Sequence, residues 1–319
     1  MTSRSDPETV LVVGGRGFVG SHLVRALVAD GFRPHLFGPA MGGGRLAGLA
    51  GRFEETVGSV EDRAGIADTI RRCGAGALVT TAAHSVGREG LLRSGDAEAD
   101  RAFAVNVGGF RNVLEAAFET GVRRVVWTSS TVVYGPAERY GDGRVDETAP
   151  TGPVTFYGLT KLLSETLARY YRDRHRLDVT GLRLPLVLGP GLWYQGAASA
   201  IVGVMAGAAA GRRHAVSFHD EPIDLMHVGD VARALIETLR HQGALEPVYN
   251  INGFTARMSE IARAAEAAVP GYVVEPTPVP PTLTFPLIDD ARFRTALGFS
   301  PDYGLADVVA AMLPPEPAP

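Results

Sequence analysis

The sequence of 319 residues contains a single cysteine, Cys73. One cysteine cannot form an intrachain disulfide or supply a cysteine metal cluster. No spacing of histidine, cysteine and aspartate indicates a metal site either, so we expect no bound metal. The lack of disulfides is typical of a reducing compartment, and we expect a cytoplasmic location.

The sequence also lacks an apolar run long enough to cross a membrane. The longest candidate, 196–211, falls short of the ~20 residues that a spanning helix needs, and Arg212 follows it. The first eight residues are polar and contain no apolar core of a signal peptide. We therefore expect no membrane partner, and we expect the Ala-rich segment to form a buried helix near the substrate site.

Charge of neither sign dominates the chain. The 31 Lys and Arg residues face 35 Asp and Glu residues, which gives a net charge of −4. Without a basic field, nucleic acid is a poor candidate partner. A hydrophobic content of 45% and a charged content of 21% are typical of an ordinary globular protein, whose expected ligand is a small molecule.

A glycine motif follows the first strongly apolar segment. Residues 10–13 form an apolar run typical of a buried parallel strand, and 18–27 has the apolar spacing of a helix. Between them, Gly14 permits a tight turn and Gly17 lets the backbone approach a pyrophosphate, while Gly20 allows close packing of helix on strand. In this context the triplet predicts a dinucleotide site at the positive N-terminus of the helix.

Strand-like and helix-like segments alternate along the first part of the chain. The strand-like runs are 10–13, 34–37, 77–81, 125–129 and 179–184, and the helix-like segments are 20–29, 63–73, 103–120 and 157–171. This alternation predicts an α/β fold: a Rossmann-type doubly wound parallel sheet with helices on both faces.

The pattern loosens after Gly189 and Pro190, where short apolar pieces and an Ala-rich segment follow. We therefore expect a dinucleotide-binding Rossmann domain over residues 1–185 and a smaller, mainly substrate-binding domain over 186–319. Part of the second region, 224–251, is expected to return to the first domain. Its two strand-like pieces, 224–228 and 248–251, would then join the main sheet.

Tyr157 and Lys161 lie four residues apart at the start of a predicted helix, so both side chains occupy one face. A free tyrosine loses its proton near pH ~10, and a nearby positive charge favours the phenolate. Such a pair can exchange a proton while hydride moves to or from a carbonyl carbon. Ser130 ends a predicted strand, at the sheet edge where ligands bind, and can donate a hydrogen bond to a substrate oxygen. The Tyr-Lys spacing alone also occurs in surface helices, and the other two motifs favour the functional interpretation.

Together these motifs resemble the extended short-chain dehydrogenases/reductases, in their epimerase/dehydratase branch. The likeness covers nearly the whole chain and includes 14–20, 106–109, 112–116, 129–135, 157–161, 182–183, 189–191 and 227–231. The resemblance implies a catalytic triad of Ser130, Tyr157 and Lys161. Tyr157 would be the acid/base and Ser130 would orient the reacting oxygen. Lys161 would bind the cofactor ribose and lower the pKa of the tyrosine.

The resemblance also implies which residues contact the cofactor. They lie in the glycine motif and along the ends of the strands: Gly14, Arg16, Gly17, Phe18, Val19, Gly20, Ser59, Ala82, Asn106, Tyr157, Lys161 and Pro185. Asn106 is also expected to position backbone and water near the site. Ser59 stands where relatives often carry an aspartate for the adenine amine, and either Ser59 or Asp62 could accept that hydrogen bond.

The second strand indicates which nicotinamide cofactor binds. NAD-preferring proteins of this fold carry an acidic residue at its end, and Gly38 occupies that place here. Arg16 stands in the glycine motif where some NADP-using relatives hold the 2′-phosphate, and Arg45 could do the same. We expect NADP, with NAD as the alternative in which Arg16 is merely exposed.

Four positions bear on the reaction. Family dehydratases place an Asp-Glu pair directly after the catalytic hydroxyl, whereas this chain has Thr131 and Val132, which cannot perform acid/base elimination at neutral pH. Nucleotide-sugar epimerases hold the diphosphate with an asparagine and an arginine, and Leu186 and Ile223 match those positions. We therefore expect a dehydrogenase/reductase that acts on a secondary alcohol or ketone. A sugar or nucleotide-sugar epimerase with retained NAD is the alternative, and dehydration is not expected.

The candidate substrate contacts are a histidine, two hydroxyl residues and two aromatic residues near the expected nicotinamide position: His84, Ser130, Thr131, Trp193 and Tyr194. The aromatic rings could line a site for a ring or alkyl group, although core packing explains them equally well. A lone histidine is also commonly structural.

The resemblance further implies a homodimer that pairs through helices matching 103–120 and 157–171. These segments carry apolar residues beyond what one buried face needs: Phe110, Leu114, Phe118, Leu163 and Leu167.

Overall fold

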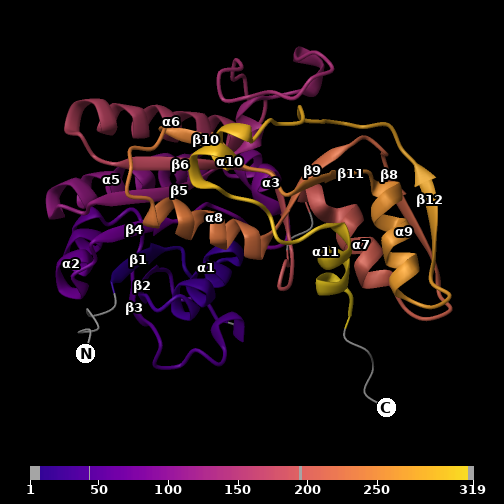
Figure 1. Ribbon diagram of the computed structural model, residues 1–319, viewed down its shortest axis with the longest axis horizontal. Helices are drawn as coiled ribbons and strands as arrows, with labels where there is room; N and C mark the ends of the chain where they lie inside the picture. Colours follow the sequence, from indigo (N-terminus) through magenta and orange to yellow (C-terminus); the bar gives the residue numbers. More distant parts are fainter. Residues whose placement is uncertain (1–7, 43, 194–195, 315–319) are drawn as a thin grey trace.

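The computed structural model describes residues 8–42, 44–193 and 196–314, and its largest element is a seven-stranded parallel sheet (Figure 1). In chain order its strands are β1 (Thr9–Val13), β2 (Arg33–Gly38), β3 (Glu54–Val57), β4 (Ala77–Thr80), β5 (Arg124–Ser130), β6 (Val179–Leu184) and β10 (Val248–Asn250). In space the order is β10-β6-β5-β4-β1-β2-β3. The order reverses between β1 and β4, and ligands of doubly wound sheets bind at such a reversal. The predicted fold class is confirmed.

Helices cover both faces of this sheet, which explains why its central strands are apolar throughout. On one face, α1 (Phe18–Ala29) and α8 (Val228–Arg240) pack Leu23 and Leu235 into the same core cluster as Val12. On the other face lie α2 (Arg63–Cys73), α5 (Gly109–Thr120) and α6 (Phe156–His175), and Ile70 of α2 shares a core cluster with Leu11. The last helix beside this sheet is α10 (Ala291–Leu297), which contacts β10.

A smaller lobe lies beside the main sheet, on the right in Figure 1. It contains β7 (Leu186–Leu188), β8 (Arg213–Phe218), β9 (Ile223–His227), β11 (Phe254–Ala256), β12 (Val273–Pro278), α7 (Ser199–Gly207), α9 (Met258–Ala268) and α11 (Leu305–Met312). Its strands form two small sheets, β11-β9-β7 and β12-β8. Apolar residues of the three helices share one core with those of the strands. The division of the chain at residue 185 stays a prediction.

The two strands expected to return to the main sheet differ in outcome. Segment 248–251 contributes β10, which pairs with β6 in the main sheet, as predicted. The prediction for 224–228 is wrong, because β9 pairs with β7 and β11 in the smaller lobe. Helix α8, which directly follows β9, does pack against the main sheet. An apolar run predicts a strand, but it does not specify that strand's partner.

The segment before β5 is more irregular than its sequence suggests. In place of one helix over 103–120, the chain forms α4 (Ala99–Phe103), a π-helical turn η2 (Ala104–Gly108) and then α5. Another helix, α3 (Gly90–Ala97), precedes α4. Single turns of 3₁₀-helix occur elsewhere: η1 (Gly44–Leu46), η3 (Thr131–Val133), η4 (Ala137–Arg139) and η5 (Gly196–Ala198).

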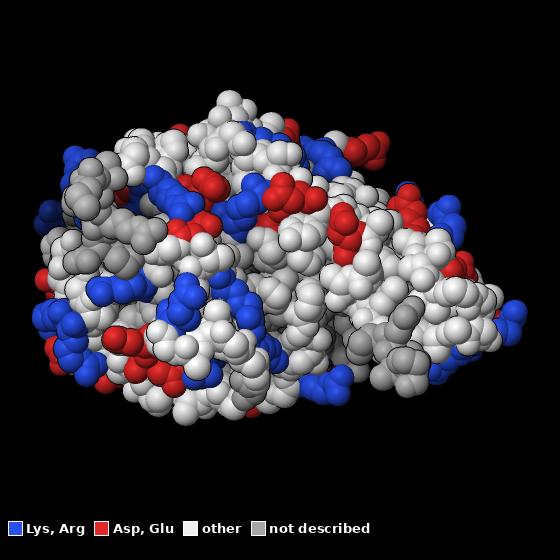
Figure 2. Space-filling model, turned by 60° about the horizontal axis from the view of Figure 1, so that its bottom comes forward, with Lys and Arg blue, Asp and Glu red and all other residues white. Residues whose placement is uncertain are grey.

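Over the described residues, no helix is long and apolar enough to cross a membrane. The Ala-rich segment forms α7, which packs in the core of the smaller lobe. On the face of the molecule in Figure 2, basic and acidic side chains are interspersed. That view shows no extended area of a single charge.

Candidate functional site

The glycine motif forms the turn between β1 and α1, at the reversal of the sheet order. Gly14 has a φ of +83°, and a Cβ there would lie 2.9 Å from the backbone nitrogen of Ala82, which follows β4. A Cβ on Gly20 would lie 2.2 Å from the Gly14 carbonyl oxygen, so only glycine allows α1 to start this close to β1. The N-cap of α1 is Gly17, and its first turn contains no acidic residue. These features fit a dinucleotide whose pyrophosphate lies at the helix N-terminus.

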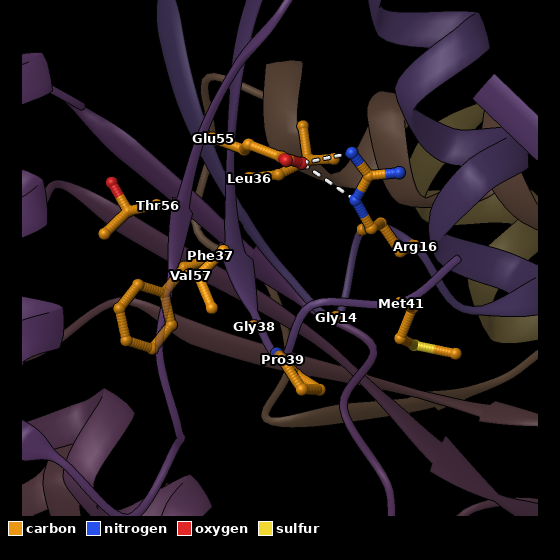
Figure 3. Close-up of a pocket in the computed structure, with 11 residues that line it drawn as sticks. Gly14, Arg16, Leu36, Phe37, Gly38, Pro39, Met41, Glu55, Thr56 and Val57 are labelled. Carbon is orange, nitrogen blue, oxygen red and sulfur yellow. Dashed lines mark hydrogen bonds and ion pairs between the residues drawn. The ribbon is translucent and has the colours of Figure 1, made fainter. Parts of the chain in front are cut away.

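A pocket adjoins this turn at the end of β2, where the adenosine ribose of a dinucleotide binds in this fold. Its lining includes Gly14, Gly38, Pro39 and Met41, with the Arg16 side chain at one side (Figure 3). No acidic residue of β2 enters it, in agreement with the glycine at position 38.

The two arginines considered for the 2′-phosphate lie in different places. Arg16 lines the pocket and pairs with Glu55 of β3 at 2.5 Å. Arg45 is not part of the pocket lining. Its guanidinium stacks over the ring of Trp193, 4.0 Å from the centroid.

The two residues considered for the adenine amine have partners within the protein. The Ser59 hydroxyl lies 3.2 Å from a Glu61 carboxylate oxygen. Asp62 is the N-cap of α2, where its carboxylate accepts a hydrogen bond from the Gly65 backbone at 3.0 Å. The Ser59 hydroxyl also accepts a 3.2 Å hydrogen bond from the Glu61 backbone, so both candidates are engaged within the protein.

Tyr157 and Lys161 lie on the first turns of α6, which Thr155 caps through a hydrogen bond from the Gly158 backbone. Both side chains are buried. The Lys161 ammonium lies 5.5 Å from the centre of the Tyr157 ring and donates a 2.7 Å hydrogen bond to the Thr128 carbonyl of β5. The structure therefore brings the tyrosine and the lysine together as predicted.

Burial sets the protonation of Lys161. Desolvation lowers its pKa from the ordinary value to about 8, and the carboxylate of Glu165, one turn along α6, acts in the opposite direction. Glu165 itself binds the buried Arg183 through both carboxylate oxygens, at 2.8 and 2.7 Å. The ammonium is therefore charged at neutral pH and loses its charge as the pH rises through about 8.

Ser130 and Thr131 lie at the junction of β5 and η3. The Ser130 hydroxyl accepts a 3.4 Å hydrogen bond from the Val132 backbone. This junction is at the carboxyl end of β5, the same edge of the sheet as the glycine turn after β1.

Asn106 connects the loop after β4 with helix α6. It lies in the π-helical turn η2, a form of helix that is frequent at functional sites. Its side-chain oxygen accepts a 2.8 Å hydrogen bond from the His84 backbone, and its amide donates to the Thr160 hydroxyl at 3.0 Å. These two hydrogen bonds hold the loop after β4 against α6, and the expected role of Asn106 in positioning backbone and water stays a prediction.

The remaining residues predicted to contact cofactor or substrate lie on several different elements. Pro185 lies between β6 and β7, and Val19 lies in α1 directly after Phe18. Trp193 packs edge-on against Phe18, with their ring centres 6.4 Å apart. Tyr194 is outside the described residues. The Nε2 atom of His84 lies 3.0 Å from a Glu98 carboxylate oxygen, within hydrogen-bond distance.

Three residues near the site were not expected from the sequence. Gly95 of α3 lies against Tyr157: a Cβ on it would be 3.0 Å from the Tyr157 backbone nitrogen. Asp96 accepts a 2.9 Å hydrogen bond from the Phe156 backbone at the start of α6. Glu55 is the third, and its short polar strand has no apolar alternation that would predict it. Each of these contacts joins residues that are far apart in the sequence, so the local sequence pattern could not predict it.

Within the part of the chain that the structure describes, no group of three or more His, Cys, Asp or Glu residues could hold a metal ion. The candidate site consists of the glycine turn, the pocket at the end of β2 and the buried Tyr-Lys pair. A doubly wound sheet with these features is typical of dinucleotide-dependent enzymes.

The chain belongs to the NAD dependent epimerase/dehydratase family, whose model matches residues 10–252. The likeness to the extended short-chain dehydrogenases/reductases is thereby confirmed. This is an enzyme family with epimerase, dehydratase and dehydrogenase members.

Curated relatives represent all three of these reactions. The chain is 28% identical over 235 residues to "L-threonine 3-dehydrogenase, mitochondrial" of Bos taurus, in a match that covers 70% of this chain and 61% of that protein. It is 27% identical to a UDP-glucose 4-epimerase of Rhizobium leguminosarum bv. trifolii, with 95% of both chains covered. It is 28% identical to a dTDP-glucose 4,6-dehydratase of Streptomyces griseus, over 95% of this chain and 92% of that one.

Among solved structures, the chain is similar to the UDP-glucose 4-epimerase of Thermus thermophilus in complex with NAD. The TM-score is 0.80 at 25% identity, with 95% of this chain and 97% of the other covered. The comparisons thus show the family and its dependence on NAD, while relatives with three different reactions match almost equally well.

Proposed function

We propose that the protein is an NAD(P)-dependent dehydrogenase/reductase that transfers hydride to or from the carbon of a secondary alcohol or ketone. The observation that carries this proposal is the buried Lys161 ammonium beside the ring of Tyr157. A positive charge beside a phenol favours the phenolate and prepares it for proton transfer near neutral pH.

Three side chains have distinct roles in this proposal. In the reducing direction the Tyr157 hydroxyl donates its proton to the substrate oxygen, and in the oxidising direction the phenolate removes it. Ser130 donates a hydrogen bond to the same oxygen. Lys161 stabilises the phenolate while its own charge is held at the Thr128 carbonyl. The bound nicotinamide supplies or accepts the hydride.

We further propose NADP as the cofactor, with NAD as the alternative. Arg16 is a cation in the pocket at the end of β2, where the NAD-type carboxylate is replaced by Gly38. The relatives and the family name support NAD, and the pairing of Arg16 with Glu55 lowers the positive charge available to a 2′-phosphate.

The alternative reaction is epimerisation of a sugar or nucleotide sugar with retained NAD, which the nearly full-length match to a UDP-glucose 4-epimerase supports. Against it stand Leu186 and Ile223, at positions where such epimerases hold the diphosphate. Leu186 of β7 and Ile223 of β9 belong to one small sheet and pack against the apolar core of the smaller lobe. Dehydration is opposed by Thr131 and Val132, which lack carboxylates.

The proposed substrate contacts are His84, Ser130, Thr131, Trp193 and Tyr194.

We also propose that the enzyme is cytoplasmic and acts as a homodimer. The helices α4, α5 and α6 support the dimer, because they expose large apolar side chains: Phe103, Phe118, Leu159 and Tyr170. Phe110 and Leu114 do not contribute to this surface, since both are buried in the core.

Product analysis separates the two reactions. The purified protein is incubated with NADPH or NADH and a panel of ketones and keto-sugars, and cofactor absorbance and substrate stereochemistry are followed together. A dehydrogenase/reductase oxidises one cofactor molecule for each molecule of product. Inversion of a sugar carbon without net cofactor oxidation would establish the epimerase instead.

A further inference from the structure

Glu55 holds the guanidinium of Arg16 at the side of the ribose pocket. One Glu55 carboxylate oxygen lies 2.8 Å from Nε and 2.5 Å from Nη2 of Arg16, and both residues belong to the pocket lining with Gly14 and Gly38 (Figure 3). The carboxylate thus engages two of the three guanidinium nitrogens.

The strand alternation of β3 brings Glu55 to this position. Glu55 lies opposite Leu36 in the parallel pairing of β3 with β2, and a Cβ on Gly15 would lie 2.7 Å from that leucine. Glu55 therefore shares the face of the sheet on which the glycine turn lies. Its neighbour Glu54 points to the opposite face, where its carboxylate lies 3.5 Å from Nδ1 of His35.

This arrangement affects the binding of NADP but not that of NAD. A 2′-phosphate is attracted by Arg16 and repelled by Glu55, and it gains the full guanidinium only if the ion pair opens. A 2′-hydroxyl carries no charge and is indifferent to this competition. The Arg16 and Glu55 side chains are 26% and 37% exposed, and an ion pair so accessible to water is weak enough for a phosphate to displace.

We propose that Glu55 is a specificity-determining residue, which competes with the 2′-phosphate of NADP for the guanidinium of Arg16. Glu55 thereby limits the preference of the site for NADP over NAD. This inference rests on the proposed binding of the 2′-phosphate by Arg16.

Binding of two nucleotide fragments tests the competition without turnover. Calorimetry measures the dissociation constants of adenosine 2′,5′-bisphosphate and of 5′-AMP, which differ only in the 2′-phosphate. Glu55→Gln should tighten binding of the bisphosphate by roughly fivefold and leave that of 5′-AMP within about twofold. Glu54→Gln is the matched control, because it removes the same charge from the other face of β3, and it should leave the ratio of the two constants unchanged.

Arg16→Gln separates this inference from the proposed function. If Arg16→Gln leaves the ratio unchanged, Arg16 does not bind the 2′-phosphate and the NADP proposal fails. If Arg16→Gln lowers the preference for the bisphosphate but Glu55→Gln does not raise it, only the role of Glu55 is overturned. In the Arg16→Gln background, Glu55→Gln should give a smaller gain than in the wild type. An equal gain would show direct repulsion of the phosphate and would overturn the competition for Arg16.

Discussion

At the residue scale, the proposed chemistry depends on the Lys161 ammonium, which is buried away from water. Lys161 is the only lysine in the sequence, and only 4% of its surface is exposed. Its hydrogen-bond partner is a neutral carbonyl, and the nearby Glu165 is already bound by Arg183. The four-residue spacing predicts that Lys161 adjoins Tyr157, but the depth of burial depends on β5 and α6 packing together. The lowered pKa could therefore not be read from the sequence.

Replacing this lysine should change how stability depends on pH. Below about pH 8 the lysine is protonated in both folded and unfolded chains. Between about pH 8 and the ordinary value of 10.5 the unfolded chain binds the additional proton, so the wild type becomes more stable as the pH rises. Lys161→Met lacks this contribution. We subtract the free energy of unfolding of Lys161→Met from that of the wild type. Between pH 7 and pH 10 this difference should rise by about 2–3 kcal/mol in favour of the wild type.

Urea unfolding of the two proteins at both pH values measures this change, since other titrating groups cancel in the difference. If the difference in unfolding free energy between wild type and Lys161→Met were the same at pH 7 and pH 10, the pKa of Lys161 would not be lowered in the folded protein.

At the scale of elements, the apolar pattern predicts the interior of the fold better than its edges. The strands at the centre of the sheet are unbroken apolar runs because helices cover both faces, and these runs are visible in the sequence. The edge strand β3 (Glu54–Val57) has no apolar run, so it was not predicted. Its Glu55 nevertheless lines the pocket at the end of β2. The π-helical turn that holds Asn106 was also missed, because one extra residue in a turn scarcely alters the apolar spacing.

At the scale of the whole molecule, one surface remains to be accounted for. Phe103 of α4 and Phe118 of α5 are 47% and 46% exposed, and Tyr170 of α6 is 55% exposed. Exposed large apolar residues on adjacent helices are typical of an interaction site. A second copy of the chain, paired through these helices, would cover them.

A single charge on this surface should dissociate the proposed dimer. Phe118→Glu would place a carboxylate in the apolar interface, and we expect the dimer dissociation constant to rise roughly tenfold or more. Val279→Glu is the control, because Val279 is 40% exposed in the smaller lobe, after β12. Light scattering at micromolar concentration should give the mass of two chains for the wild type and for Val279→Glu. A wild type with the mass of one chain would refute the dimer.

The most direct test of the proposed chemistry is the rate of net NADPH or NADH oxidation by wild type and Tyr157→Phe with the same carbonyl substrate. The account predicts that Tyr157→Phe lowers kcat by about 10²–10⁴, the usual effect of losing a positioned general acid. Cofactor affinity should stay nearly intact, because the phenylalanine ring preserves the packing of Tyr157. Turnover by Tyr157→Phe at the wild-type rate would contradict the assignment of Tyr157 as the acid/base.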